Sequence, residues 1–166
     1  MTQQNINLPQ LESLAMTWEN FFETFKPEGL FLQYMNVDSI HKSINQKRIS
    51  ITEINYYYGK IRHKSYGECN SGVLYFYEWL IYLNSISNIN KPLPPKAIEQ
   101  LSIILYSKYY YFYLSDLKLI LEGLLEGQYG KFYGSVDAQL IMSAFKEYAA
   151  ARKKTEENIK SNKVIY

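Results

Sequence analysis

Apolar residues recur at three- and four-residue steps along most of the chain, a spacing that places them on one face of an α-helix. The first such series consists of Leu11, Leu14, Trp18, Phe21 and Phe25. Pro9 precedes this series, and proline is tolerated in the first turn of a helix. Pro27 and Gly29 follow it. We therefore predict an amphipathic helix that begins near Leu11 and ends near Lys26.

The middle of the chain continues this periodicity with interruptions. Residues 30–50 keep a weaker helical rhythm, and their structure is ambiguous. Thr52 is placed to cap a helix that runs through EINYYYGKIRHK, residues 53–64. Ser71 is placed to cap a strongly apolar helix over residues 73–87.

Three further helices are expected in the C-terminal part of the chain. Pro95 suits the first position of a helix that runs into YSKYYYFY. A second helix starts at Ser115 and is stopped by Gly127, because glycine adopts a positive φ angle without penalty. Ser135 or Asp137 caps the last helix. Its apolar face is formed by Leu140, Ile141, Ala144, Phe145 and Tyr148.

These patterns predict an all-α fold, a compact bundle of about six helices. We expect residues 1–152 to form a single helical domain. The proline-rich segment 91–95 also fits a junction between two packed helical halves, residues 1–90 and 96–152. Residues 153–166 lose apolar side chains, which predicts a polar C-terminal tail, either an extended solvated segment or a self-supporting polar helix.

The composition, with 47% hydrophobic residues, is that of a globular chain. Its longest apolar stretch is too short to span a bilayer, and the N-terminus does not resemble a signal peptide. The single cysteine, Cys69, cannot form an intramolecular disulfide, which suits a reducing compartment. We therefore expect a cytoplasmic protein that does not contact a membrane. The sequence leaves its oligomeric state open.

Positive charge is concentrated in residues 41–67, which carry six lysines and arginines against one glutamate. Within this segment the stretch YYYGKIRHKSY places tyrosines directly before four basic residues. Cations that neutralise phosphates and aromatic rings that stack on bases together bind single-stranded nucleic acid. The predicted binding residues here are Tyr57, Lys60, Arg62, His63 and Lys64. The alternative interpretation is a solvated basic helix face above buried tyrosines.

The stretch EGQYGKFYGSVDAQ, residues 126–139, raises the question of a phosphate-binding loop. A Walker A loop requires four residues between its first glycine and its Gly-Lys pair, then a serine or threonine. Here two residues intervene and Phe132 follows the lysine, so we interpret the stretch as a turn between helices. The turn can still present Tyr129, Lys131 and Tyr133 to a partner. Alternatively, these rings pack back on the flanking helices.

The remaining candidate residues give weaker indications of binding or catalysis. Arg152 and Lys153 could add a second basic contact to a partner. His41, His63 and Cys69 are too few and too dispersed for a zinc site, so we predict neither a metal nor a cofactor. An enzymatic function would rest on Cys69 or on scattered carboxylates. The seventeen tyrosines have either a binding role or a purely compositional origin.

The stretch GQYGKFYGSVDAQLIMSAFKEYAAAR, residues 127–152, resembles a segment of small, mostly uncharacterised helical proteins carried by phages and conjugative elements. The resemblance rests on the Gly-x-Tyr-Gly-Lys turn, the following Tyr-Gly, Asp137, Tyr148 and Arg152. It covers about a sixth of the chain and implies an origin in a bacterial mobile element, without any established activity.

From these features we predict a non-catalytic interaction protein of a mobile element. Its partner would be a nucleic acid, either RNA or single-stranded DNA, or a protein complex that handles nucleic acid. The protein would act as an inhibitor, as anti-defence and anti-CRISPR proteins do, or as an adaptor. The alternative is a DNA-binding regulator or replication accessory protein with a helix-turn-helix whose recognition helix begins near Ser135.

Overall fold

The computed structural model describes residues 10–46, 48–64 and 66–164. Its helices are α2 (Gln10–Leu14), α3 (Trp18–Phe25), the 3-10 turn η1 (Pro27–Gly29), α4 (Leu30–Gln33), α5 (Ile40–Gln46), α6 (Ile51–Tyr58), α7 (Ser71–Ile86), α8 (Pro95–Tyr109), α9 (Leu114–Leu125) and α10 (Ala138–Val164). Between α6 and α7, strands β1 (Lys60–His63) and β2 (Gly67–Asn70) form an antiparallel hairpin.

The mainly helical character of the fold is confirmed, but two details of the prediction are wrong. The described part of the chain holds nine α-helices rather than about six, and the hairpin means that the fold is not strictly all-α. The helix predicted from Leu11 to Lys26 is broken into α2 and α3. Ala15 adopts a positive φ of 53°, and the Thr17 hydroxyl caps α3 by accepting a hydrogen bond from the Asn20 N–H at 3.1 Å. Pro9 lies outside the described residues.

Two predicted caps also differ from the observed ones. Ser50, rather than Thr52, caps α6 by accepting the Glu53 N–H at 3.0 Å. Asn70 occupies the N-cap position of α7, and Ser71 is the first helical residue instead. The hydroxyl of Ser71 donates to the carbonyl of Ile54 at 3.2 Å, which ties the start of α7 to α6.

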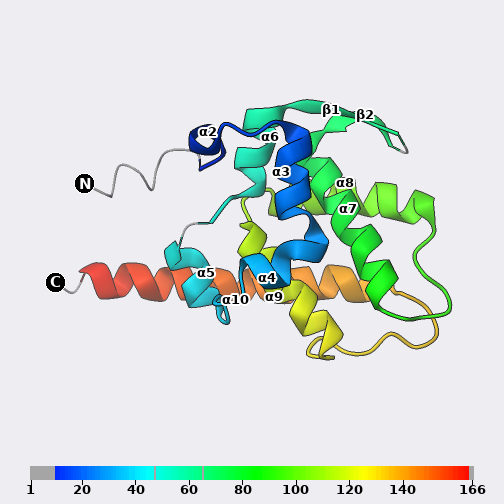
Figure 1. Ribbon diagram of the computed structural model, residues 1–166. Coiled ribbons are helices and arrows are strands. Elements are labelled where there is room, and N and C mark those ends of the chain that lie inside the picture. The colour runs from blue at the N-terminus through cyan, green and yellow to red at the C-terminus, as the bar shows by residue number, and fades with distance from the viewer. Residues whose placement is uncertain (1–9, 47, 65, 165–166) are drawn as a thin grey trace.

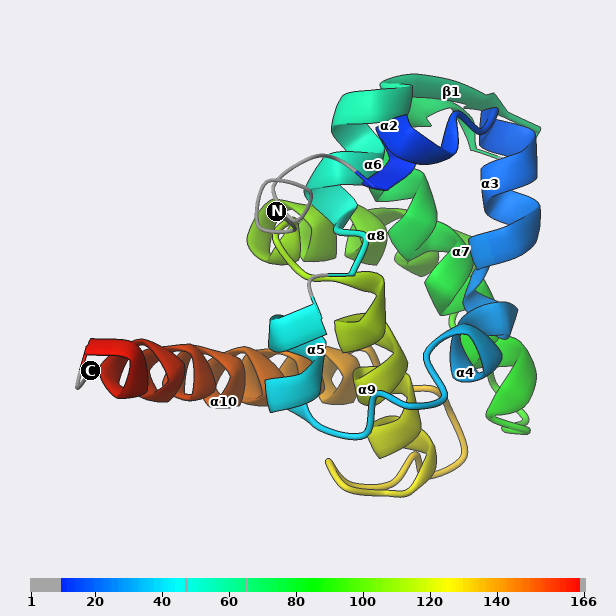
Figure 2. The ribbon, with the colours of Figure 1, turned by 60° about the vertical axis from the view of Figure 1, so that its left-hand side comes forward.

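The elements form two groups of helices around one core (Figures 1 and 2). Helix α10 lies at one end of the molecule with α5 and α9 packed against it, and α4 packs on α9, whereas α2, α3, α6 and the hairpin lie at the other end. Helices α7 and α8 run between them. A single buried cluster extends from Leu11 to Tyr148 and includes Trp79 and Phe145, whose rings meet edge to face at 5.3 Å. Residues from both sides of segment 91–95 therefore share one core.

The proline-rich segment is held in place from two sides. The side-chain amide of Asn84 on α7 donates to the Leu93 carbonyl at 3.0 Å and accepts the Leu93 N–H at 2.9 Å. The carbonyl of Lys91 accepts the N–H of Val136 at 2.8 Å, so the connection before α10 runs beside this segment. These bonds make the α7–α8 connection a fixed part of the fold.

A buried carboxylate joins three helices. Asp116 on α9 is fully buried, and its Oδ2 accepts Arg152 Nε of α10 at 3.0 Å and the Tyr113 N–H at 2.7 Å. Its Oδ1 accepts the hydroxyls of Tyr148 on α10 at 2.5 Å and Ser43 on α5 at 2.9 Å. Every donor is therefore aimed at a single side chain that has no access to water.

Helix α10 continues through the segment predicted as a polar tail. Residues 153–164 belong to it, and in Figure 2 its C-terminal part extends beyond the other elements. Glu156 on this helix contacts Arg152 Nη1 at 3.4 Å, an i,i+4 ion pair of the kind that supports a helix. The segment is thus a helical projection with polar faces.

Some of the tyrosines have a structural role in the core. Five of them are buried members of the core, namely Tyr34, Tyr75, Tyr77, Tyr109 and Tyr148. Tyrosine suits this role because its ring packs while its hydroxyl finds an acceptor. Tyr75 illustrates this, because its ring is buried and its hydroxyl donates to the carbonyl of Phe25.

Replacing Asp116 should destabilise the whole fold. In Asp116→Ala the guanidinium of Arg152 stays buried without its counterion, and such a loss costs about 3–5 kcal/mol of unfolding free energy. Urea denaturation followed by circular dichroism measures this change. The matched control is Asp38→Ala, which removes an exposed partner of Lys42 and should leave the midpoint nearly unchanged. Equal midpoints for the two variants would contradict the proposed role of Asp116.

Alkaline pH should unfold the protein through its tyrosines. Burial raises the hydroxyl pKa of Tyr34, Tyr75 and Tyr148 above 10, and it raises the pKa of Tyr58 to about 12. The unfolded chain releases these protons near pH 10, whereas the folded chain retains them. The unfolding free energy is therefore undiminished below about pH 10 and falls as pH rises above it.

Urea unfolding at a series of pH values, together with tyrosinate absorbance, checks this expectation. Tyr58→Phe should make the decline above about pH 10 shallower, because one fewer hydroxyl must ionise on unfolding. Complete ionisation of the tyrosines near pH 10 without loss of helical circular dichroism would contradict it.

Candidate interaction surface

The hairpin begins where Gly59 reverses the chain after α6. Gly59 has φ +62° and ψ −132°, a conformation that is essentially restricted to glycine. Its N–H donates to the Asn55 carbonyl at 2.9 Å and its own carbonyl accepts the Ser71 N–H at 2.8 Å. The side-chain oxygen of Asn55 accepts the Gly72 N–H at 3.1 Å. The backbone around Gly59 thus closes the base of the hairpin.

The inward side of β1 fixes the hairpin on α7. Ile61 packs against the core, and His63 Nε2 lies 2.8 Å from the Glu78 carboxylate. His63 Nδ1 accepts the N–H of Tyr66 at 3.3 Å, which leaves Nε2 as the nitrogen that donates to Glu78. The His63 ring also stands edge to face with Tyr77 at 5.9 Å. These contacts make His63 an anchor of the hairpin rather than an exposed binding group.

Glu78 is a half-buried partner for this histidine. Burial raises the pKa of the Glu78 carboxyl, and the neighbouring His63 partly opposes that rise by favouring the carboxylate. The contact with His63 therefore reduces the cost of placing an acid within the apolar helix α7.

The outward side of β1 carries the predicted cations. Successive side chains of a strand point to opposite faces, so Lys60 and Arg62 share the exposed face, and exposed Lys64 follows in the turn. Glu68 on β2 lies directly across from Arg62 and is also exposed. The outer face thus presents three cations against one carboxylate. The helix predicted over these residues is wrong, because Gly59 ends α6 and a strand follows.

Tyrosines at the end of α6 lie one short turn before these cations. Tyr57 is 37% exposed, and its ring stands edge to face with Tyr58 at 5.0 Å. Tyr56, which the sequence analysis did not single out, is 81% exposed. The sequence around Tyr56 did not indicate this exposure. Three tyrosines are adjacent there, and only their positions around the helix decide which ring faces water.

The loop between α9 and α10 is a turn, as predicted. Gly127 has φ +78° and its N–H donates to the Leu124 carbonyl, while the Gln128 N–H donates to the Gly123 carbonyl at 2.9 Å. This pair of bonds is the Schellman motif that ends many helices. Of the two predicted caps of α10, Asp137 supplies the contact, because its Oδ1 accepts the Gln139 N–H at 2.8 Å.

The three candidate residues of this loop separate from one another. Tyr129 is half-buried and packs back on α9, where a Cβ added at Gly123 would approach its ring to 2.6 Å. Lys131 is exposed, and Tyr133 is 87% exposed. Burial raises the pKa of the Tyr129 hydroxyl, with a further contribution from Glu147. Only Lys131 and Tyr133 are therefore available to a partner from solvent.

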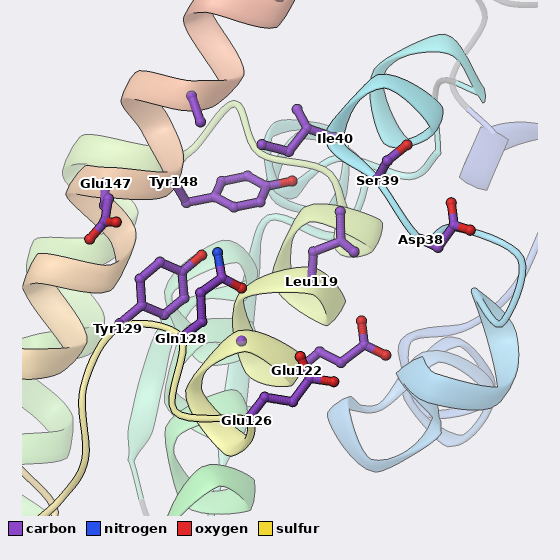
Figure 3. A pocket seen from close by; sticks show the side chains of 12 residues that line it. Asp38, Ser39, Ile40, Leu119, Glu122, Glu126, Gln128, Tyr129, Glu147 and Tyr148 are labelled. Carbon is purple, nitrogen blue, oxygen red and sulfur yellow. The ribbon is translucent and has the colours of Figure 1, made fainter.

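Tyr129 also lines an acidic pocket of about 280 Å³ (Figure 3). Its carboxylates come from the segment before α5, from α9 and from α10, namely Asp38, Glu122, Glu126 and Glu147. Glu122 is paired with the buried Lys118 ammonium at 3.3 Å. An excess of carboxylates repels phosphate, so this pocket does not support a nucleic-acid contact through Tyr129.

Arg152, predicted to contact a partner, is an internal residue. Its side chain is 4% exposed, it is bound to Asp116, and its guanidinium lies 5.2–5.5 Å from the ring centres of Tyr111, Phe112 and Tyr113. Lys153, its neighbour, is exposed on α10. The sequence could not separate the two, since adjacent basic residues on a helix point in different directions.

The predicted site residues thus do not form one surface. The hairpin lies at the opposite end of the molecule from α10, and the loop that carries Lys131 and Tyr133 leads into the start of α10, away from the hairpin (Figure 1). Residues 126–137 separate α9 from α10, whereas a helix-turn-helix uses a turn of three or four residues. The geometry therefore gives the regulator alternative no support.

The described ranges give little support to a metal site or to a reactive thiol. No group of three or more histidine, cysteine or acidic side chains there converges on a common point suited to a metal ion. Burial raises the pKa of the Cys69 thiol, which disfavours the reactive thiolate. No helix in this part of the chain is both long enough and apolar enough to cross a bilayer.

Comparison with protein families gave one match. Residues 93–164, which are less than half of the chain, match a family described as a family of unknown function (DUF6633). This stretch contains α8, α9 and α10, and it leaves the hairpin outside. Comparisons with curated proteins and with solved structures gave no match.

Gly59→Ala should loosen the hairpin. An alanine in this backbone conformation is strained by about 1–3 kcal/mol. Amide hydrogen exchange should accelerate in β1 and β2, while α9 and α10 keep their protection. Gly29→Ala is the matched control, because Gly29 has an ordinary φ of −93° and an added Cβ would meet its nearest neighbour at 3.5 Å. Unchanged exchange in the hairpin of Gly59→Ala would show that this conformation is not required.

Proposed function

We propose that this protein is a non-catalytic interaction protein that binds the phosphate backbone of a single-stranded nucleic acid through its β-hairpin. The partner is an RNA or DNA strand, either free or within a nucleoprotein complex. The observation that carries this proposal is the exposed cationic face of β1, where Lys60 and Arg62 alternate with inward-pointing residues and Lys64 extends the series.

The geometry of the strand supports a chain-like anionic partner. Lys60 and Arg62 are two residues apart, which places them roughly 7 Å apart along the strand. Cations in such a row contact successive phosphates without reading sequence. The exposed ring of Tyr56 and the partly exposed ring of Tyr57 precede this row, and aromatic rings of this kind stack on bases.

The anchoring of the hairpin supports a preformed surface. The hydrogen bond from His63 to Glu78 and the closure at Gly59 hold β1 in place before any partner arrives. A preformed surface loses little conformational entropy on binding. Because binding covers a surface and breaks no bond, the protein can act as an inhibitor of anti-defence or anti-CRISPR type, or as an adaptor in nucleic-acid handling. An origin in a mobile element belongs to this proposal through the resemblance over residues 127–152.

The test is a charge-removal variant of the hairpin. Lys60→Ala, Arg62→Ala and Lys64→Ala combined should abolish most binding to single-stranded oligonucleotides in an anisotropy assay. Binding of the unmodified protein should weaken steeply with salt, with a logarithmic slope of about −0.7 for each phosphate neutralised. In the variant the magnitude of that slope should fall by about two, because three phosphate contacts are lost.

The matched control removes three cations elsewhere. Lys91, Lys96 and Lys108 are exposed on α8 and on the connection before it, and their replacement with alanine changes the net charge equally. The control should bind nearly as well as the unmodified protein. Equal losses in the two variants would indicate a general effect of charge and would contradict a hairpin site. Oligonucleotide binding retained by the hairpin variant would also contradict a hairpin site.

A further inference from the structure

A second pocket, of about 430 Å³, lies between the α8–α9 junction and α10, away from the hairpin. It is lined by Tyr111, Ala149, Ala150, Arg152, Lys153 and Glu156. All six residues lie within the stretch that matches the family of unknown function. The volume falls within the range of about 300–1,000 Å³ that is usual for small-molecule sites.

The aromatic wall of this pocket is held in a fixed orientation. The ring of Tyr111 stands edge to face with Tyr110 at 5.7 Å and with Phe112 at 5.0 Å, with interplanar angles of 82° in both pairs. The guanidinium of Arg152 lies 5.4 Å from the Tyr111 ring centre. Tyr111 is nevertheless 40% exposed. A planar ligand can therefore stack on a ring that is already oriented.

The floor of the pocket exists because α10 carries short side chains here. Ala149 and Ala150 fill little space, so the surface is hollowed between Tyr111 and the next turn of α10. A residue of ordinary length at either position would occupy the space into which a ligand could enter.

The charges at the pocket favour an anion at one position. Lys153 is exposed, and it makes no ion pair with any residue that the structure describes. Glu156 is already paired with Arg152 at 3.4 Å, and Arg152 is itself held by Asp116. Arg152 is thus shared between two carboxylates and has no charge to offer a further anion. Lys153 is therefore the cation at the pocket that remains to bind an anion.

Two further lysines extend this charge along α10. Lys146 and Lys160 lie one heptad before and after Lys153, and all three are exposed. Residues seven apart lie on nearly the same side of a helix, about 10.5 Å from one another. Between Lys153 and Lys160 this side of α10 also carries Glu156 and Glu157, so the cations stand at separate points along it.

We infer that this pocket binds a nucleotide, with the base stacked on Tyr111 and the phosphate bound by Lys153. An oriented aromatic ring beside a cation is the combination that holds a nucleobase and its phosphate. The nucleotide is either free or part of a single strand whose next phosphates follow Lys146 or Lys160. This inference is independent of the hairpin proposal, because the two surfaces share no residue.

The experiment uses the full chain with two probes, adenosine monophosphate by calorimetry and a labelled short oligoadenylate by anisotropy. Tyr111→Leu should weaken binding about tenfold or more, since it removes base stacking. Tyr111→Phe keeps the ring and should retain binding. Lys153→Ala should weaken binding and reduce the dependence on salt.

Matched controls lie outside the pocket. Tyr133→Leu removes a ring that is 87% exposed and does not line the pocket, and Lys154→Ala removes an exposed cation that does not line it either. Both should bind as the unmodified protein does. The hairpin variant should retain binding of adenosine monophosphate, so failure of the hairpin proposal is distinguishable from failure of this one.

The outcomes separate the two sources of nucleotide. Binding of both probes indicates a free nucleotide site, whereas binding of the oligoadenylate alone, lost in Tyr111→Leu, indicates a single-strand site. No binding of either probe would overturn the inference, as would inorganic phosphate competing as well as adenosine monophosphate. Equal effects of Tyr133→Leu and Tyr111→Leu would also overturn it, as would unaltered binding by both Tyr111→Leu and Lys153→Ala.

Discussion

The carboxylate of Asp116 is the constraint on which the arrangement of the helices depends. A charge without access to water is tolerated only when it is paired and fully hydrogen-bonded. Asp116 meets this condition through groups from α5, α9 and α10. Misplacing any of these helices would leave a buried donor or acceptor unsatisfied, so the network specifies their mutual orientation more strictly than apolar packing does. The same network fixes Arg152 and thereby the wall of the pocket beside Tyr111.

Local sequence patterns predicted the helices where apolar spacing and strong terminators agreed. The stop at Gly127 and the start of α8 at Pro95 are examples. The patterns failed at residues 60–63, where a strand follows a helix, because four residues of alternating polarity are too few to show either period. The apolar spacing of Ile54, Tyr58 and Ile61 continued across Gly59, although the backbone conformation of that residue ends the helix. Burial of Arg152 could not be predicted either, since its partner lies 36 residues away and only the tertiary fold brings them together.

The candidate surfaces differ in how they use the same residue types. On the hairpin, strand geometry gathers cations that a helix would have spread over several faces. On α10, heptad spacing aligns lysines beside short alanines and an oriented tyrosine. At the acidic pocket a tyrosine is instead surrounded by carboxylates, which repel phosphate. The surroundings of each ring, rather than the number of tyrosines, therefore determine its role.

The hydrogen bond from Ser43 to Asp116 makes residues 93–164 depend on another part of the chain. It crosses from α5 into the stretch that matches the family of unknown function, and Trp79 of α7 likewise donates to the Leu117 carbonyl at 3.3 Å. Residues 93–164 in isolation would expose the aspartate and the apolar faces that these two helices cover. In this protein the matched stretch is thus an incomplete folding unit, and any graft of it onto another scaffold must bring substitutes for α5 and α7.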